Sequence, residues 1–121
     1  MRSEDLRQRT KQFSLQVIAL WRRLPQSAEY QDIGDQLRRA ADGVASNYRA
    51  ARCGRSCDEF TAKLGTVREE ADECQHWLEV LADIGLQDDS LEWLRRESSE
   101  LVAIFVASLK TANRRRRKKG K

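Results

Sequence analysis

Proline is almost absent from this 121-residue sequence, which has one proline and only six glycines. So few turn-forming residues disfavour a β-rich fold, whereas a chain rich in alanine, leucine, glutamate and arginine is typical of helices. No stretch approaches the roughly 18 consecutive apolar residues of a membrane span. The charged first eleven residues also lack the apolar core of a secretory signal. We therefore expect one all-α domain, in the cytoplasm and without a membrane partner.

Cysteine and histidine are scarce as well, with three cysteines and one histidine in the whole chain. An odd number of cysteines without a secretory signal argues against a disulfide framework. A zinc site would need Cys53, Cys57, Cys74 and His76 together, and their spacing is unusual for structural zinc. Cys74 and His76 lie two positions apart on a predicted helix, so they do not face each other as a catalytic pair. We expect no catalytic residues, no metal and no cofactor.

An acidic cluster, Glu69, Glu70, Asp72 and Glu73, is the other candidate for metal chemistry. Spacings of three and four residues could gather these carboxylates on one helix face. A di-metal site in a helix bundle uses Glu-x-x-His motifs from two helices, and only Glu73 with His76 supplies one. We therefore favour a solvated face that pairs with arginines across a helix or subunit boundary.

Apolar residues recur at steps of three and four in four segments, which is the spacing of one helix face. The segments run over residues 3–24, 31–52 and 56–84, and from 89 or 90 to about 111. Pro25 ends the first segment, because the residue before proline is pushed out of helical geometry. Gly54 is a C-terminal cap for the second. Ser56 and Glu59 form a capping box at the start of the third, which ends at Gly85.

Short connections between four long helices favour antiparallel neighbours. The predicted fold is an all-α, antiparallel up-down-up-down four-helix bundle over residues 1–113. In the third segment the apolar steps alternate between four and three, close to the 3.5-residue repeat of left-handed bundle packing. The second segment is rich in alanine, so we expect it to approach its neighbours closely. The fourth segment has an apolar face made of Leu91, Leu94, Leu101, Ile104, Phe105 and Leu109.

Charge is unevenly distributed along the chain, although the net charge is only +4. Residues 69–100 contain eleven acidic and two basic residues, whereas residues 101–121 contain eight basic residues and no acid. Residues 114–121 form a like-charge run that we expect to be a disordered basic tail. Such an arm adds salt-sensitive affinity for nucleic acid, but basic tails also bind acidic proteins or only maintain solubility. The tail cations are Arg114, Arg115, Arg116, Arg117, Lys118, Lys119 and Lys121.

A second basic group lies on the predicted helix over residues 31–52. Arg38, Arg39, Arg49 and Arg52 share its polar line. These arginines could bind phosphate, or they could pair with the acid-rich segment that follows. Asn47, among alanines on the same helix, could hydrogen-bond across the bundle as a structural polar residue. The candidate nucleic-acid-binding residues are therefore these four arginines and the seven cations of the tail.

Three segments of the chain resemble a known family. They are residues 37–51, with Leu-Arg-Arg-Ala-Ala and then Val-Ala-Ser-Asn-Tyr-Arg-Ala-Ala; residues 55–60, Arg-Ser-Cys-Asp-Glu-Phe; and residues 69–86, with Glu-Glu-Ala-Asp-Glu and then Trp-Leu-Glu-Val-Leu. They resemble the bacterial four-helix-bundle family encoded within intervening sequences of large-subunit ribosomal RNA genes. Ala50 departs from the pattern, since the family usually has a glutamate there, and the arginine tail is an individual addition.

The resemblance implies a bundle that forms ring-shaped homopentamers and has no enzyme activity, with RNA association suggested by gene location. A related group resembles accessory proteins of diversity-generating retroelements, which bind a reverse transcriptase and nucleic acid. We therefore expect a non-enzymatic homo-oligomer that binds RNA or DNA, with RNA preferred. The alternative is a protein-interaction scaffold or accessory subunit, for example of a reverse transcriptase. Any of Trp21, Trp77 and Trp93 that is exposed would need a partner surface.

Overall fold

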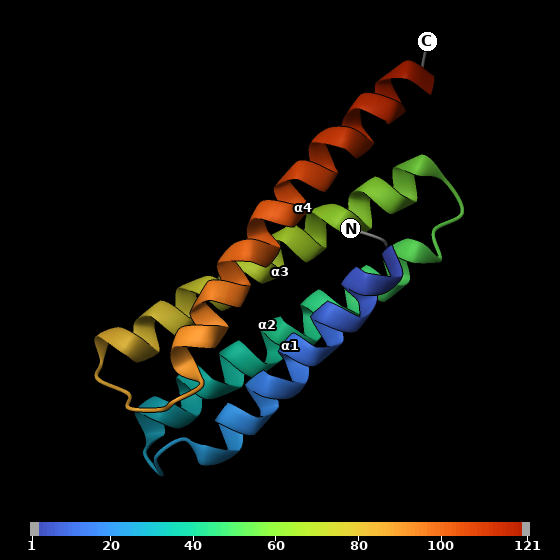
Figure 1. The fold of residues 1–121 in the computed structure, drawn as a ribbon. Helices are drawn as coiled ribbons and strands as arrows, with labels where there is room; N and C mark the ends of the chain where they lie inside the picture. The colour runs from blue at the N-terminus through green and yellow to red at the C-terminus, as the bar shows by residue number, and fades with distance from the viewer. Residues whose placement is uncertain (1–2, 120–121) are drawn as a thin grey trace.

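Residues 3–119 are described by the structure, a computed structural model, and they form four α-helices with no strand among them. The helices are α1 (Ser3–Arg23), α2 (Ala28–Arg52), α3 (Cys57–Asp83) and α4 (Leu91–Lys119). Figure 1 shows them running alternately up and down with short connections, which confirms the predicted antiparallel up-down-up-down bundle. α2 packs on α1 and α3, and α3 packs on α4, whereas α1 and α4 contact each other more sparsely.

The core consists of the apolar stripes that the spacing predicted for each helix. Its largest fully buried side chains include Phe13, Leu20, Leu37, Leu64, Leu78, Leu81, Leu94, Leu101 and Phe105. Burying one such side chain stabilises the fold by about 1.5–3 kcal/mol. Ala40 and Ala41 of α2 are also buried, in keeping with the close approach expected for that helix. None of the helices over residues 3–119 has a stretch long and apolar enough to cross a membrane.

The helix boundaries follow local hydrogen bonding. α2 begins three residues before the predicted start because the Ser27 hydroxyl accepts a hydrogen bond from the Tyr30 amide, at 3.2 Å. At the start of α3 the Ser56 hydroxyl accepts from the Glu59 amide at 3.1 Å, as predicted. The Glu59 carboxylate, however, accepts from the Arg55 amide at 2.8 Å, one residue before the position expected for a capping box. Both bonds fix the α2–α3 turn.

The C-terminal tail differs from the prediction, because α4 continues through Lys119 instead of ending near Thr111. No proline or glycine interrupts residues 91–119. Arginine and lysine are good helix formers and suit the negative end of the helix dipole. Figure 1 shows the last turns of α4 extending beyond the other three helices. The structure therefore replaces the expected disordered tail with helix over residues 114–119, while residues 120 and 121 lie outside the described range.

Candidate nucleic-acid interface

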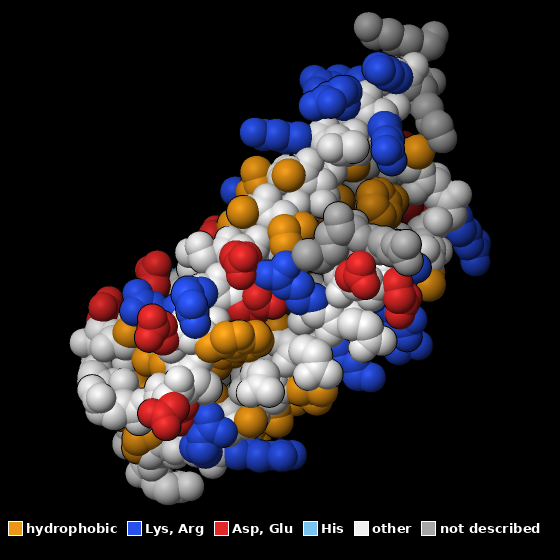
Figure 2. All heavy atoms as spheres, viewed as in Figure 1, with side chains coloured by type: hydrophobic (Ala, Val, Ile, Leu, Met, Phe, Trp, Pro, Cys, Tyr) orange, Lys and Arg blue, Asp and Glu red, His pale blue; other side chains and the backbone are white. Residues whose placement is uncertain are grey.

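The tail arginines lie at the end of the bundle where α2 ends and α3 begins. The exposed cations on these turns of α4 are Arg114, Arg115, Arg116, Arg117 and Lys118. Figure 2 shows Lys and Arg side chains gathered over this end, whereas acidic and basic side chains are mixed over the rest of the visible face. Arg116 Nε lies 3.8 Å from Asp58 Oδ1, which links the tail to the first turn of α3. Of the other predicted tail residues, Lys121 and the side chain of Lys119 lie outside the described part.

Arg52 joins the C-terminal end of α2 to this basic end. Its Nη1 donates a hydrogen bond to Glu4 Oε2 at 2.9 Å, which ties the last turn of α2 to the first turns of α1. This bond lowers the pKa of the Glu4 carboxyl below its usual value. The guanidinium is thereby held in place at the bundle surface, although Glu4 offsets part of its charge.

A pocket of about 650 Å³ lies between the α2–α3 turn and the end of α4, and we call it the basic pocket. Three arginines line it from three different segments: Arg52 from α2, Arg55 from the turn and Arg115 from α4. The rest of the lining is Tyr48, Ala51, Gly54, Ser56, Cys57, Phe60, Thr61 and Ala112. The sequence predicted Arg52 and Arg115 as binding residues but did not predict Arg55, whose only local signal was its place beside a helix cap.

Gly54 lets the α2–α3 turn lie close against α3 at the basic pocket. A Cβ atom at this position would lie 3.1 Å from the Ala51 carbonyl oxygen and 3.2 Å from the Phe60 amide nitrogen. Both distances are shorter than ordinary van der Waals contact, and both neighbours are backbone atoms that cannot rotate away. Glycine therefore allows the turn to fold back against α3. This close approach places Arg55 beside the pocket.

The remaining predicted arginines of α2 lie elsewhere. Arg38 and Arg39 precede Arg52 by more than three turns, roughly 20 Å along the helix axis. Arg38 stacks its guanidinium over the Trp21 ring, 5.0 Å from the ring centroid, in a cation–π contact. Arg39 and Arg49 are exposed and do not line the basic pocket. The predicted polar line of α2 is therefore divided, and only Arg52 lies beside the tail.

Asn47 is a structural residue of α2 itself. Its side-chain amide donates to the Gly43 carbonyl oxygen at 2.9 Å, within the same helix. The hydrogen bond that we expected across the bundle is not formed, because the carbonyl one turn earlier lies within reach. Gly43 in turn leaves room for the Glu70 carboxylate of α3, which a Cβ atom would strike. Burial, followed by the nearby charges of Glu73 and Glu69, raises the pKa of Glu70.

The acidic cluster of α3 forms no ion pair with the arginines that the structure describes. Among the described residues, no ion pair joins Glu69, Glu70, Asp72 or Glu73 to a basic side chain. Glu73 instead accepts a hydrogen bond from the Trp77 indole at 3.2 Å. The expected pairing across a helix boundary is therefore not observed. Pairing across a subunit boundary stays a prediction.

The cysteines and the histidine are dispersed over the bundle. Cys74 is fully buried, and burial raises the pKa of its thiol, so the reactive thiolate is disfavoured. His76 is exposed and contacts the Trp77 ring edge-on at 4.7 Å between centroids. Cys74 and His76 thus point to opposite sides of α3. In the part of the chain that the structure describes, no three His, Cys, Asp or Glu side chains are grouped to hold a metal ion.

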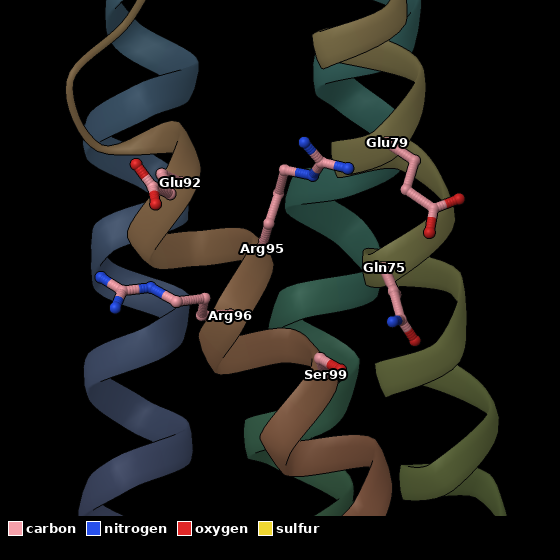
Figure 3. A pocket seen from close by; sticks show the side chains of 6 residues that line it. All are labelled: Gln75, Glu79, Glu92, Arg95, Arg96 and Ser99. Carbon is pink, nitrogen blue, oxygen red and sulfur yellow. The ribbon is translucent and has the colours of Figure 1, made fainter.

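A second pocket, of about 310 Å³, lies between α3 and α4. Figure 3 shows the Arg95 side chain extending from α4 toward α3, which carries Glu79 and Gln75, while the Arg96 side chain points to the other side of α4. Both acidic and basic side chains line this pocket. Its mixed charge contrasts with the basic pocket, whose lining among the described residues has three arginines and no carboxylate. The basic pocket is therefore the better anion site.

Comparison with known proteins gives a family and a fold. The 23S rRNA-intervening sequence protein family matches residues 2–107, so the match ends before the tail arginines. A solved structure of a protein of unknown function, from the S23 ribosomal protein family of Bacteroides thetaiotaomicron, superposes with a TM-score of 0.82 at 22% identity. That similarity covers 91% of this chain and 99% of the other, and it shows the shared fold. No curated protein matches the chain. The family match spans most of the bundle, and the chain belongs to the 23S rRNA-intervening sequence protein family.

Proposed function

We propose that this protein is a non-enzymatic, homo-oligomeric bundle that binds nucleic acid, preferably RNA, through the basic end of each protomer. The observation that carries the proposal is the convergence of Arg52, Arg55 and Arg115 on one pocket, next to the exposed arginines of the α4 extension. Arginine is suited to this role because its planar guanidinium can donate two parallel hydrogen bonds to a phosphate.

The distribution of charge supports the same function. The acid-rich residues 69–100 lie on the part of α3 that is farther from the basic end, on the α3–α4 connection and on the first turns of α4. A polyanion approaching the bundle would therefore be attracted most strongly to the basic end. Each phosphate that the tail neutralises would release counterions, so binding by this end must weaken as salt rises.

The test compares the full protein with a version that ends at Asn113, binding structured RNA across a salt series. We expect truncation to weaken binding and to reduce the slope of log K against log salt by about 0.7–0.9 for each phosphate that the tail would have neutralised. Arg22→Gln is the matched control, because Arg22 is exposed at the opposite end of the bundle. If neither form binds, or if truncation leaves affinity and slope unchanged, the proposed role of the tail is wrong.

The exposed aromatic surface supports the homo-oligomeric part of the proposal. Trp21 and Trp77 are partly buried, and their indole nitrogens donate to Asp35 and Glu73. Trp93 is 41% exposed on α4, and tryptophan is enriched in the contact surfaces between proteins. Light scattering should give a mass near 70 kDa for a pentamer, five times 14.0 kDa, and Trp93→Gln should lower it. A particle of 14.0 kDa would contradict the oligomer.

The exposed Trp93 also favours the second candidate function, an accessory subunit that docks on another protein. In that case the protein would retain a stoichiometric partner, for example a reverse transcriptase, during purification from its native host. Trp93→Gln should release that partner while leaving RNA binding at the basic end intact. Binding of RNA without any retained protein would favour the first proposal instead.

A further inference from the structure

The basic pocket combines a charged and an apolar surface. Its lining includes Arg52, Arg55 and Arg115 together with the aromatic residue Phe60 and the small apolar residues Ala51 and Ala112. Its volume of about 650 Å³ falls in the range of small-molecule sites. Phosphate alone would need only the arginines. The aromatic lining indicates a ligand that also has a flat, apolar part.

We propose that the basic pocket holds one unpaired nucleotide of a single-stranded nucleic acid, with its phosphate on the arginines and its base against Phe60. This inference rests on the proposed function and adds to it the strandedness of the ligand. A base that is still stacked in a duplex cannot stack on an aromatic ring of the protein. An unpaired base can, and stacking on aromatic rings is how sequence-tolerant sites hold single strands.

The arginines that line the pocket are suited to a phosphate. Arg52 is oriented by its hydrogen bond to Glu4, and the backbone next to Arg55 is fixed because its amide donates to Glu59. The guanidinium groups of Arg55 and Arg115 have no ion-pair partner among residues 3–119. Two arginines therefore remain available for an anion, and the third is held in place beside them.

The aromatic residues of the pocket have different tasks. Tyr48 is 4% exposed, and its ring packs against Phe105 at 5.7 Å between centroids, so it supports the floor from within the core. Phe60 is only partly buried and packs at the edge of the core, which leaves part of its ring available in the pocket. Phe60 is therefore the residue on which a base would stack.

The arginines on either side of Arg115 in α4 could contact the phosphates next to the bound nucleotide. Arg114 and Arg117 are exposed on the turns next to Arg115 and have no ion-pair partner among the described residues. A strand anchored in the pocket by one nucleotide could pass its neighbouring phosphates along these side chains. An acidic peptide could also meet the arginines, but its carboxylates would gain nothing from Phe60. The aromatic lining thus favours nucleic acid over an acidic protein segment.

The experiment measures fluorescence anisotropy of the full-length protein with three probes of equal phosphate number. The probes are a single-stranded oligouridylate, the same backbone without bases, and an RNA duplex. We expect the oligouridylate to bind more tightly than the abasic strand by about 5- to 150-fold, the contribution of one base stacked on an aromatic side chain. This comparison needs no variant, so it does not depend on the folding of a mutant.

Two pairs of variants locate the effect in the pocket. Phe60→Leu should reduce oligouridylate binding to the level of the abasic strand, and it should not change duplex binding. Phe60→Tyr, which keeps an aromatic ring, should preserve oligouridylate binding. Arg115→Gln should weaken oligouridylate binding more than Arg117→Gln, although both remove one charge from the same helix. Circular dichroism would check that each variant remains helical.

The outcomes separate this inference from the proposed function. Equal binding of the oligouridylate and the abasic strand, with duplex binding retained, would overturn the pocket and leave the tail as a phosphate-binding element. If no nucleic acid bound, both proposals would fail together. Tight binding of polyglutamate that depends on Arg115 but not on Phe60, in place of oligouridylate binding, would identify the pocket as a site for acidic protein segments and also overturn the inference.

Discussion

The ion pair between Arg9 of α1 and Glu97 of α4 is expected to hold together the most sparsely packed seam of the bundle. Arg9 Nε and Nη2 donate to the two carboxylate oxygens of Glu97, each at 2.8 Å, and Nη2 also donates to Glu100 at 3.1 Å. The Glu97 side chain is 10% exposed and that of Arg9 is 23% exposed. The paired groups thus lie between a buried and a surface environment.

Glu97→Gln should destabilise the bundle by about 2 kcal/mol. Removing one partner of a fully buried pair costs about 3–5 kcal/mol, whereas an exposed pair contributes about 0–1 kcal/mol. The variant would remove the 10% exposed carboxylate of Glu97 from the half-buried Arg9 charge, whereas the Glu100 carboxylate that stays beside it is 66% exposed. The cost should therefore fall between the two limits. In a chain of this length it corresponds to a decrease in Tm of about 6–10 °C.

Thermal unfolding followed by circular dichroism would measure this change at one fixed protein concentration, because self-association also shifts Tm. Glu100→Gln is the matched control, since it alters the same residue type, helix and partner at an exposed position, and it should cost about 0.5 kcal/mol or less. The double variant Arg9→Gln with Glu97→Gln should cost less than the sum of the single variants. Additive effects, or equal costs for Glu97→Gln and Glu100→Gln, would refute the reasoning.

Three further outcomes follow from individual residues. Gly85→Ala should cost about 1–2 kcal/mol in urea unfolding, because Gly85 has φ +95° and no neighbouring atom that a methyl group would strike. A thiol reagent should label exposed Cys53 in the folded protein but buried Cys74 only after unfolding. The pKa of Asp88 is held below its usual value, chiefly by the Arg23 hydrogen bond. The ionised Asp88 carboxylate therefore stabilises the folded state above about pH 3.9, and this stabilisation is lost as the pH falls further. The stability difference between wild type and Asp88→Asn, measured by urea unfolding, should therefore shrink in acid.

Most of the fold could be predicted because apolar spacing is a local property of the sequence. The Ser56 cap and the Gly85 end were predictable for the same reason, since each depends on neighbours within a few residues. The start of α2 was missed because Ser27 lies outside the apolar pattern, although a serine ahead of a helix is itself a cap signal. Local sequence rules thus predicted the four helices, and the errors lay in the residues at which a helix begins or ends.

The ion pair at the α1–α4 seam was missed although the sequence contained a sign of it. The apolar face of α4 jumps from Leu94 to Leu101, and the helical repeat requires buried positions between them. Glu97 and Ser98 occupy those positions and are both buried. The gap therefore marked a buried polar site on α4. Its partner on α1 could not be predicted, because periodicity does not determine which arginine of another helix lies opposite.

The basic pocket could not be predicted from local sequence rules, for a different reason. Arg55 and Arg115 are far apart in sequence, and they meet only because α4 is long enough to return to the α2–α3 turn and continue past it. The run of like charges predicted a disordered tail, which offers no geometric basis for such a meeting. Predicting the pocket would have required the length of α4, and that depends on how far a charged helix continues beyond its packed part.

The helical state of the tail changes what its four consecutive arginines can do. In a disordered arm they would be interchangeable, because each could reach the same phosphates. On a helix successive residues are rotated by about 100°, so they face different surroundings. Arg115 lines the basic pocket, Arg116 lies next to Asp58, and Arg114 and Arg117 are exposed. A fixed helix therefore requires unequal effects of the same substitution along the run, whereas equal effects would indicate an arm that binds only by its charge.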